Sequence, residues 1–379
     1  MSEKREKIKV GITHGDVNGV GYEVILKAFT DNKMLDLCTP VIYGSKKYST
    51  VHKSQLKMEN FPFFFIESSD DAKKNKVNLI DCCEDQEDLN LGEPTISSGK
   101  AAYQSLEKAV SDLRNNKIDV VVTAPINKKN IQGENFDFPG HTEFLSQQDA
   151  GNKGLMFMIS EKLKIGVVTG HIPLKDVSLA ISTEEIEEKL TIMNQSLIRD
   201  FNIRKPKIAV LGLNPHSGDN GLLGTEEQDV IIKAIQNACQ KNIIAHGPFP
   251  ADGFFGSSQY SNYDGVLAMY HDQGLIPFKA LSFGEGVNFT AGLSFVRTSP
   301  DHGTGYDIAG ENKADSSSMR KAIYTAIEIC KNRHFNDGLQ KNAIRSQSVR
   351  EKGPGASSLQ RNNRGERKSQ NKPASNVSE

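Results

Sequence analysis

Three short apolar runs in the middle of the chain each lead into a turn that carries a histidine. The runs are 165–168, 208–211 and 266–269, and the histidines are His171, His216 and His271. Short apolar runs bounded by Gly and Pro turns are typical of strands buried on both faces, as in parallel sheets covered by helices. The pattern therefore predicts three buried parallel strands, with an imidazole at the carboxyl end of each, where open α/β sheets bind ligands.

Strand-like runs alternate with helical patterns over most of the chain. Strands are predicted at 8–13 and 118–123 among others, and helices at 98–116, 184–199, 225–242 and 317–331. Ser98 is predicted to cap the first of these helices, and Thr225 with Gln228 to form a capping box at the third. The alternation indicates an α/β protein with mainly parallel strands, and 379 residues suffice for two domains or one large unit split by a cleft.

The charge of the chain is unevenly distributed. Residues 341–379 carry nine Lys and Arg against three Asp and Glu, a local charge of +6, whereas the whole chain has a formal charge of −1. The remainder is mildly acidic, at −7, which argues against a nucleic-acid-binding surface. Residues 346–379 are poor in large apolar side chains, so we predict that this tail is disordered; its use as a basic arm for an anionic partner stays open.

Composition also bears on where the protein works. No run approaches the roughly 18 apolar residues of a membrane span, and residues 1–9 lack the apolar core of a signal peptide. The five cysteines have no metal-binding spacing and fit reduced thiols. We therefore expect a cytoplasmic protein with neither a membrane nor a nucleic acid as its partner.

The three histidines are candidate metal ligands. Imidazole is the commonest protein ligand for zinc and similar divalent ions, and three imidazoles leave a coordination position open for a substrate. Cobalt, manganese or, less comfortably, magnesium would also fit these donors. A single histidine in such a turn more often hydrogen-bonds its own loop. Three histidines that each follow the carboxyl end of a strand favour a metal site.

Two further sets of polar residues are candidate ligand contacts. His141 and Thr142 follow Phe138-Pro139-Gly140 at the start of a short helix, where free amides and the helix dipole favour an anion. On pattern alone, Thr142 is equally well explained as the N-cap of that helix. Lys279, Asn288 and Arg297 recur at nine-residue intervals among apolar neighbours, and together they would suit a small phosphorylated, zwitterionic substrate.

The last cluster of residues resembles a known cofactor loop. The segment 302–310, His-Gly-Thr-Gly-Tyr-Asp-Ile-Ala-Gly, is similar to the adenosine-binding loop of the isocitrate/isopropylmalate dehydrogenase superfamily. Within it, the chain resembles the 4-hydroxythreonine-4-phosphate dehydrogenase family of pyridoxal phosphate biosynthesis. The matching segments are Thr123-Ala124-Pro125-Ile126-Asn127-Lys128, Phe138-Pro139-Gly140-His141-Thr142-Glu143, Gly212-Leu213-Asn214-Pro215-His216-Ser217-Gly218 and Tyr270-His271-Asp272-Gln273-Gly274.

The resemblance implies a two-domain fold with mainly parallel sheets and an interdomain cleft. We expect a first domain at 1–135 plus 290–338 with the cofactor loop, a second at 136–289 with the metal ligands and dimer interface, and a disordered basic tail at 339–379. The implied partner is a second copy of the chain. In such a homodimer His271 reaches the metal held by His171 and His216 of its neighbour.

The resemblance also implies residue roles. The substrate contacts fall on His141, Thr142, Lys279, Asn288 and Arg297, and the contacts to NAD or NADP on His302, Gly303, Thr304, Asp307 and Asn312. Asp272 is either a catalytic group or a residue that orients His271. The family's first turn carries Pro-Ala-Gly-Ile-Gly-Pro-Glu, where this chain has Val17-Asn18-Gly19-Val20-Gly21-Tyr22-Glu23. The chain therefore departs from the family in this turn, and the turn can differ in shape.

The implied reaction is the oxidation of 4-phosphooxy-L-threonine by a nicotinamide dinucleotide, assisted by a divalent metal. The product, 2-amino-3-oxo-4-phosphooxybutanoate, decarboxylates to 3-amino-2-oxopropyl phosphate. Erythronate or threonate 4-phosphate, which lack the amino group, are alternative substrates. A phosphate acyltransferase shares the fold but would need neither three histidines on a metal nor a nucleotide loop, and a non-catalytic binding protein would not need the complete set of matched residues.

Overall fold

The computed structural model describes residues 7–84, 87–150, 152–282 and 284–341. Residues 342–379, which hold nearly all of the predicted disordered tail, lie outside the described residues. Residues 339–341, which we assigned to that tail, continue the last helix.

Twelve strands form one continuous sheet in the described part of the chain. Its order is β3-β4-β2-β1-β5-β12-β11-β6-β7-β10-β8-β9. The strands are β1 Ile8–Thr13, β2 Cys38–Gly44, β3 Phe63–Ile66, β4 Val77–Asp81, β5 Val120–Thr123, β6 Leu155–Ile159, β7 Lys164–Thr169, β8 Lys207–Leu211, β9 Ile244–Phe249, β10 Gly265–Tyr270, β11 Val287–Ala291 and β12 Val296–Pro300.

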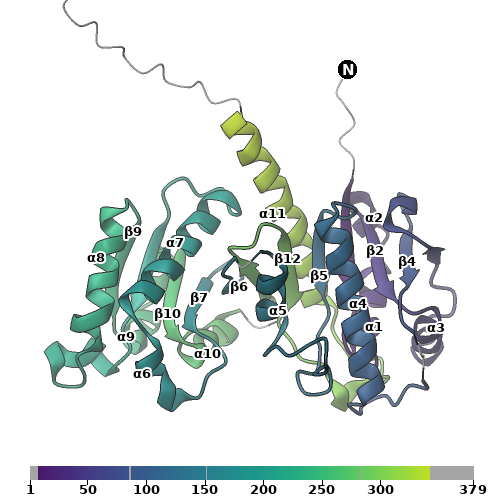
Figure 1. Cartoon of the computed structure of the whole chain (residues 1–379), viewed down its shortest axis with the longest axis horizontal. Coiled ribbons are helices and arrows are strands. Elements are labelled where there is room, and N and C mark those ends of the chain that lie inside the picture. The colour runs from purple at the N-terminus through teal and green to yellow at the C-terminus, as the bar shows by residue number, and fades with distance from the viewer. Residues whose placement is uncertain (1–6, 85–86, 151, 283, 342–379) are drawn as a thin grey trace, which may run out of the picture. The chain divides into compact units, whose positions relative to one another are not determined.

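Helices follow most of these strands and complete the α/β alternation (Figure 1). They are α1 Gly21–Ala28, α2 Lys33–Leu37, α3 Lys46–Gln55, α4 Ile96–Arg114, α5 His141–Gln148, α6 Val177–Ala180, α7 Thr183–Arg199, α8 Ile232–Gln240, α9 Ala251–Gly256, α10 His271–Leu281 and α11 Ser317–Lys341.

Eight of the eleven strand pairings are parallel. The three antiparallel pairings are all in the middle of the sheet, at β12–β11, β11–β6 and β6–β7. The prediction of an α/β fold with mainly parallel strands is therefore confirmed. The sheet runs without a break through both predicted domains, and the division into two domains stays a prediction.

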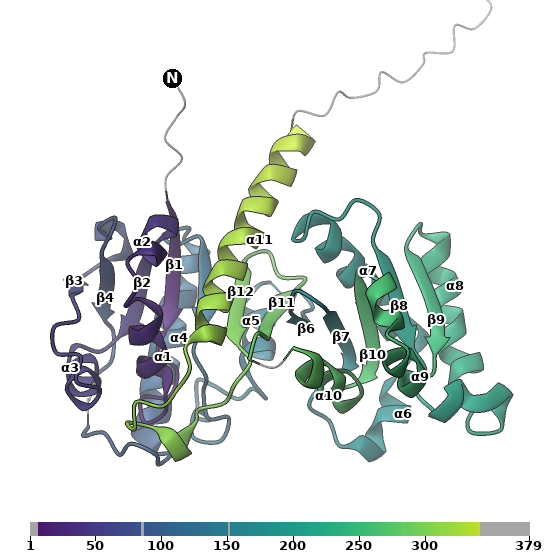
Figure 2. The same cartoon turned by 180° about the vertical axis from the view of Figure 1, so that it is seen from behind.

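Apolar side chains cover both faces of the N-terminal half of the sheet, because its strands alternate their residues between the two sides. Val10 of β1 and Val122 of β5 belong to the core that also contains residues of α1 and α11. Val121 of β5 belongs to a separate cluster with Leu113 of α4. Figure 1 shows α4 on the near face, and Figure 2, from behind, shows α1 on the other.

The last helix joins parts of the chain that are distant in sequence. Arg333 of α11 donates from Nε to Asp200 Oδ1, which lies at the end of α7, over 2.6 Å. Both side chains are buried. Thr298 of β12 bonds the carbonyl of Ala322 in the same helix over 2.8 Å. Helix α11 therefore ties the strand that precedes the predicted cofactor loop to the segment around α7.

Two predicted helix starts were wrong in detail. Thr95, not Ser98, is the N-cap of α4, and Ser98 closes a capping box as the third residue of the helix. At the predicted helix 225–242, one turn of π-helix at Glu227–Ile231 precedes α8, and the Thr225 side chain forms no cap. Thr225 instead accepts hydrogen bonds through its backbone carbonyl from the amides of Gln228 and Asp229.

No helix in the described ranges is both long and apolar enough to cross a membrane.

Candidate active site

A pocket of about 310 Å³ opens where several strands of the sheet end. Its walls come from the segment after β5, the start of α5, the loop after β7, the start of α10, and strands β11 and β12. All five residues that the sequence assigned to the substrate line it, namely His141, Thr142, Lys279, Asn288 and Arg297. We call this cavity the substrate pocket.

Arg297 supplies a buried positive charge at the base of the substrate pocket. It is 2% exposed, and its guanidinium donates to the hydroxyls of Thr123 and Thr290 over 2.7–3.2 Å. Burial lowers its pKa to about 10, which still leaves it charged at neutral pH. No carboxylate in the described part of the chain forms an ion pair with it, although the charge of Glu143 acts on it, so its guanidinium still has donors available to an anionic ligand.

Four side-chain atoms of the substrate pocket are buried without a hydrogen-bond partner in the described structure. They are His141 Nε2, Glu143 Oε2, Asn288 Oδ1 and His302 Nε2. Burial, and then the charges of Arg297 and Lys128, hold the pKa of His141 well below its usual value. Because buried polar atoms are normally bonded, four orphaned atoms around one cavity indicate a site built for a polar ligand.

Neither His141 nor Thr142 caps the start of helix α5. Gly140 is the N-cap residue of α5, and no side chain caps this helix. Thr142 is the second residue of the helix and faces the pocket, so the interpretation of Thr142 as a simple N-cap was wrong.

Two of the three candidate metal ligands lie together at the mouth of the substrate pocket. The rings of His171 and His271 are 5.5 Å apart between centroids, within one chain. Asp272 Oδ1 lies 2.7 Å from His271 Nδ1, a contact that fixes the ring and leaves Nε2 to face a ligand.

His216 is placed differently. It lies in the loop after β8, exposed and outside the substrate pocket. Within the described ranges no group of three His, Cys, Asp or Glu side chains has a geometry that could hold a metal ion. The three histidines do follow adjacent strands, in the order β7-β10-β8, as the sequence predicted, but the structure gathers only two of them.

The loop that carries His216 has an unusual backbone. His216, Ser217, Asp219 and Asn220 have φ values of 42–57°, in the left-handed region that non-glycine residues rarely adopt. The buried carboxylate of Glu227 anchors the start of the loop, accepting from the amides of Leu213 and Asn214 over 2.7–2.8 Å. Consecutive left-handed residues cost about 1–2 kcal/mol each, and such strain is typical of functional loops.

Sequence reasoning missed the role of two charged residues in the substrate pocket. Lys128 places Nζ 3.0 Å from His171 Nε2, and Glu143 lines the cavity with a buried Oε2 that has no hydrogen-bond partner in the described structure. Both belong to segments recognised as family-like, but no role was assigned to either. A lysine five residues beyond a buried strand was the one available signal.

A second pocket of about 340 Å³ adjoins the substrate pocket at Asp301, His302 and Gly303. Val20, Val24, Ile308 and Ala314 give it an apolar wall. Of the residues predicted to bind the dinucleotide, His302 and Gly303 line it, whereas Thr304, Asp307 and Asn312 do not. Thr304 instead accepts a hydrogen bond from Val20 through its carbonyl, and Asp307 and Asn312 are exposed.

The first turn, Thr13–Gly21, links the predicted cofactor loop, 302–310, to the substrate pocket. Asp16 is 1% exposed, and its Oδ2 accepts from Ser98, Asn130 and the Tyr306 hydroxyl over 2.7–3.0 Å. Gly15 has a φ of 70°, and a Cβ there would overlap the carbonyl oxygen of Pro125.

The residues that depart from the family in this turn have structural partners. Val17 accepts a hydrogen bond from His52 Nε2 over 2.8 Å. Asn18 donates to the Glu93 carbonyl over 2.9 Å and accepts from the Asn90 amide over 3.0 Å. The altered turn is therefore firmly held and attached to the segment that leads into α4.

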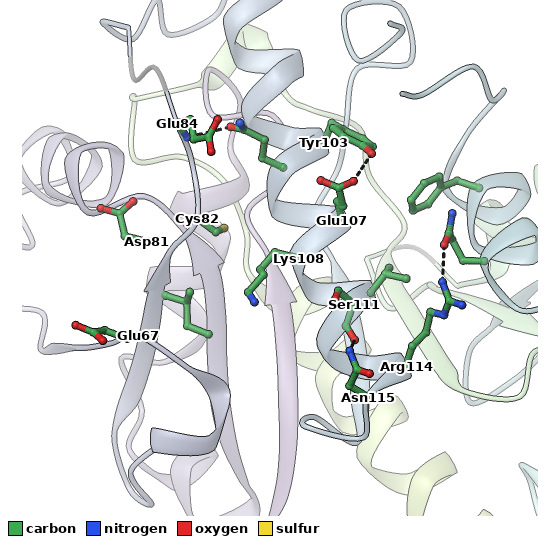
Figure 3. A pocket seen from close by; sticks show the side chains of 15 residues that line it. Glu67, Asp81, Cys82, Glu84, Tyr103, Glu107, Lys108, Ser111, Arg114 and Asn115 are labelled. Atoms are coloured by element: carbon green, nitrogen blue, oxygen red, sulfur yellow. Dashed lines mark hydrogen bonds between the residues drawn. The ribbon is translucent and has the colours of Figure 1, made fainter. Parts of the chain in front are cut away.

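A larger cavity, of about 870 Å³, lies elsewhere in the described part of the chain, between the end of β4 and α4 (Figure 3). Its polar side chains bond one another: Tyr103 donates to Glu107 over 2.6 Å, and Arg114 to Gln148 over 3.0 Å. None of the orphaned buried atoms lies in it. Size alone therefore does not identify the functional site of this chain.

The chain is similar to proteins of one family along most of its length. The family model for the pyridoxal phosphate biosynthetic protein PdxA matches residues 36–326. A 4-hydroxythreonine-4-phosphate dehydrogenase of Bacteroides thetaiotaomicron is 49% identical over 345 residues, which cover 91% of this chain and 94% of that relative. A putative D-threonate 4-phosphate dehydrogenase of Oceanobacillus iheyensis is 38% identical over 325 residues, covering 84% and 97% of the two chains.

A solved structure agrees with these relatives. The crystal structure of 4-hydroxythreonine-4-phosphate dehydrogenase from Klebsiella pneumoniae superposes with a TM-score of 0.74 at 33% identity, covering 86% of this chain and 99% of that one. The sequence resemblance to this family is therefore confirmed, and the chain belongs to the PdxA family of pyridoxal phosphate biosynthetic proteins.

Proposed function

We propose that this protein is the dehydrogenase that oxidises 4-phosphooxy-L-threonine with a nicotinamide dinucleotide and releases 3-amino-2-oxopropyl phosphate after decarboxylation. The observation that carries the proposal is the substrate pocket. It combines a buried arginine that forms no ion pair within the described residues with four orphaned polar atoms, and it adjoins the apolar pocket beside the predicted cofactor loop. The names of the relatives support the same activity.

The residues of the pocket divide the substrate between them. Arg297 and Lys279 supply positive charge for the phosphate, and the Asn288 amide lies on the same side, on β11. His141 and Thr142 at the start of α5 add donors in the same pocket, where helix amides favour an anionic group of the substrate. The hydroxyl to be oxidised would lie beside His171 and His271.

A divalent metal fits the chemistry of the donors at that point. Two imidazoles converge, and Asp272 holds one of them with its Nε2 turned outward. When bound, a metal would lower the pKa of the substrate hydroxyl and stabilise the enolate left by decarboxylation. His171, His271 and His216 would hold the ion, and Lys128 would give up its contact with His171 Nε2.

A homodimer explains the position of His216. Exposed apolar side chains flank all three histidine loops, namely Ile172 and Leu174 after His171, Leu222 and Leu223 after His216, and Ile276 after His271. Exposed large apolar side chains near a site are typical of a surface that a second subunit covers. We infer that a second copy covers it and that a histidine of that copy completes the metal site.

The cofactor would occupy the pocket of about 340 Å³, with its adenosine against Val20, Val24 and Ile308. His302 and Gly303, which border both pockets, would then lie between the adenosine and the reacting carbon. NAD is the cofactor that we propose, with NADP as the alternative, and a cytoplasmic location stays a prediction from the sequence.

The second candidate function is the oxidation of a four-carbon sugar-acid 4-phosphate. The relative from Oceanobacillus iheyensis carries the name of such an enzyme, and threonate has a hydroxyl in place of the amino group. The same phosphate, carboxylate and metal contacts would serve both substrates.

The test is a turnover assay that separates the candidates. Reduction of NAD or NADP is followed by absorbance with 4-phosphooxy-L-threonine or erythronate 4-phosphate, with a divalent metal and then with a chelator. The proposal predicts rapid reduction with the amino acid that stops on chelation, and 3-amino-2-oxopropyl phosphate as the product in a mass spectrum. Reduction with the sugar acid alone would contradict it, as would turnover that is indifferent to the chelator.

A further inference from the structure

Two cysteines lie next to each other directly after strand β4, and they differ in exposure. Cys82 is half-buried and lines the cavity of about 870 Å³ between β4 and α4 (Figure 3). Cys83 is 7% exposed and belongs to a buried cluster with Tyr22 and Ala101. Both are thiols in the described structure. Small solutes therefore reach the pair through the sulfur of Cys82, and the sulfur of Cys83 is shielded from them.

The two thiols are in contact with each other. A hydrogen bond with the Cys82 thiol, and then burial, raises the pKa of the Cys83 thiol far above its usual range. Cys83 is therefore protonated and does not react with an oxidant by itself, because the thiolate is the reactive form. Cys82 Sγ also bonds the carbonyl of Gly44 over 3.5 Å. The pair thus combines an accessible sulfur with a second sulfur beside it that can react with the first.

A histidine of the first turn contacts the buried thiol. His14 Nδ1 lies 2.7 Å from the Gly15 carbonyl, which can only accept, so Nδ1 carries the proton of the neutral ring. Nε2 is then an acceptor, and it lies 3.4 Å from Cys83 Sγ. The carbonyl of Ala101 is the more distant acceptor, 3.9 Å from the same sulfur. The Cys83 thiol can therefore donate to His14 and join the end of β4 to the first turn.

We propose that Cys82 and Cys83 form a reversible oxidation site, at which a peroxide converts the two thiols into a disulfide and thereby loosens the first turn. The Cys82 sulfur attacks one peroxide oxygen, the O–O bond breaks, and Cys82 becomes a sulfenic acid while the other oxygen leaves as water or an alcohol. The Cys83 sulfur then attacks the Cys82 sulfur and the S–O bond breaks. The hydroxyl leaves as water with the Cys83 proton, so two electrons pass from the thiols to the peroxide.

The spacing of the two residues makes the disulfide easy to reduce again. Cα atoms joined by a trans peptide are about 3.8 Å apart, whereas most disulfides join Cα atoms about 4.4–6.8 Å apart. A ring closed between adjacent residues is therefore strained, and strained disulfides are reduced more readily than structural ones. A dithiol reductant would restore both thiols.

The disulfide removes the hydrogen that Cys83 can offer to His14. His14 Nε2 would then be a buried acceptor that has lost its donor, which costs stability. The first turn also holds the predicted cofactor loop, since the Val20 amide donates to the Thr304 carbonyl over 2.9 Å. We therefore expect the oxidised protein to bind the dinucleotide more weakly. This last consequence rests on the proposed function, whereas the oxidation and the loss of stability do not.

The experiment treats the full chain with hydrogen peroxide and follows each cysteine by alkylation and peptide mass spectrometry. The proteins are the wild type, Cys82→Ser, Cys83→Ser and the matched control Cys239→Ser, which changes an exposed cysteine outside this cavity. Parallel samples contain dimedone, which captures sulfenic acids, and dithiothreitol is added afterwards to test reversal. Melting temperature and titration calorimetry with NAD are measured before and after oxidation.

The wild type and Cys239→Ser should each lose two hydrogens from the peptide that contains residues 82 and 83, and dithiothreitol should restore them. Cys83→Ser should accumulate a sulfenic acid at Cys82 that dimedone captures. Cys82→Ser should keep Cys83 reduced at the same peroxide concentration. Oxidised wild type should melt about 2–4 °C lower and bind NAD about tenfold more weakly, and peroxide should change neither quantity in Cys82→Ser.

A wild type whose Cys82 and Cys83 both remain thiols while Cys239 is oxidised would overturn the inference, as would a Cys82 sulfenic acid that never becomes a disulfide. A disulfide that leaves the melting temperature unchanged would overturn the loosening of the first turn. Failure of the proposed function is a separate outcome, since a reduced wild type that neither binds nor reduces NAD would contradict the function, and the oxidation and the fall in melting temperature would still support the oxidation site. Circular dichroism spectra identical to wild type establish that each variant is folded.

Discussion

The first turn and the substrate pocket both bury carboxylates, but the two carboxylates differ in their bonding. Around Asp16, the carboxylate accepts from Ser98, Asn130 and Tyr306 within the protein, although Asn130 Oδ1 and Thr13 Oγ1 have no partner in the described structure. In the substrate pocket, His141, Glu143 and Asn288 each keep a buried atom without a partner. Since orphaned buried groups cost free energy, the first region holds the fold together, and the second keeps its bonding capacity for a ligand.

The comparison predicts a steep loss of stability in acid that originates in the first turn. Burial lowers the pKa of His14 and of His52 to about 4, from an ordinary value of 6.5. Because the folded state excludes the protons that the unfolded chain binds below pH 6.5, this contribution is full above 6.5 and is lost as the pH falls to about 4. At that pH, protonation of each histidine has lowered the free energy of unfolding by about 3 kcal/mol.

Urea unfolding at pH values between 7 and 4 measures this effect. His52→Gln, which can still donate to the Val17 carbonyl, should remove about half of the histidine contribution to the pH dependence. A wild type and variant with the same slope between pH 6.5 and 4 would show that His52 is not buried in its neutral form.

The second prediction concerns the substrate pocket. His171→Ala should lower kcat/KM by about a thousandfold, equivalent to about 4 kcal/mol, because it removes a group beside the reacting hydroxyl. The melting temperature should stay within about 2 °C of wild type, since His171 is exposed and supports no core contact. His246→Ala, the same change outside the pocket, should retain activity, and comparable losses in both variants would contradict the assignment.

The third prediction returns to the first turn. Asp16→Ala should destabilise the fold by about 3 kcal/mol, because Ser98, Asn130 and Tyr306 lose their common acceptor in a buried place. It should also weaken dinucleotide binding, since Tyr306 belongs to the loop proposed to bind the cofactor. Chemical unfolding and calorimetry measure the two effects, with Asp252→Ala, an exposed aspartate, as the control. Unchanged stability would contradict the contrast between the two regions.

The smallest effect expected is that of Glu143→Gln on stability. Its orphaned oxygen contributes no bond to the fold, so the unfolding free energy should change by less than about 0.5 kcal/mol or rise slightly. A loss as large as that of Asp16→Ala would place Glu143 with the structural network instead of the ligand site.

The elements of the fold were largely readable from the sequence, because apolar periodicity is a local property. The strand Ile8–Thr13 and the helix ending at Arg199 were predicted to within a residue or two. Helix starts were less certain, since Thr95 and Ser98 are both hydroxyl residues and either can cap α4. Which one does so depends on the path of the chain before the helix.

Only those residues of the candidate site that belong to a recognisable motif were predictable from the sequence. The five residues predicted to bind the substrate do line one pocket, but a motif could not place His216, which lies outside that pocket in a loop with left-handed backbone. The partnership of Asp16 with Tyr306 joins residues 290 positions apart, and that of Lys128 with Glu143 crosses from a loop to a helix. Such contacts follow from tertiary packing, which no local pattern records.

The most direct test of this contrast is a crystal structure of the protein with 4-phosphooxy-L-threonine bound. We predict that the ligand lies in the substrate pocket, that His141 Nε2, Glu143 Oε2 and Asn288 Oδ1 each come within hydrogen-bonding distance of it or of a water that it holds, and that the bonds around Asp16 are unchanged. A ligand bound in the larger cavity between β4 and α4, with the three atoms still orphaned, would contradict the account.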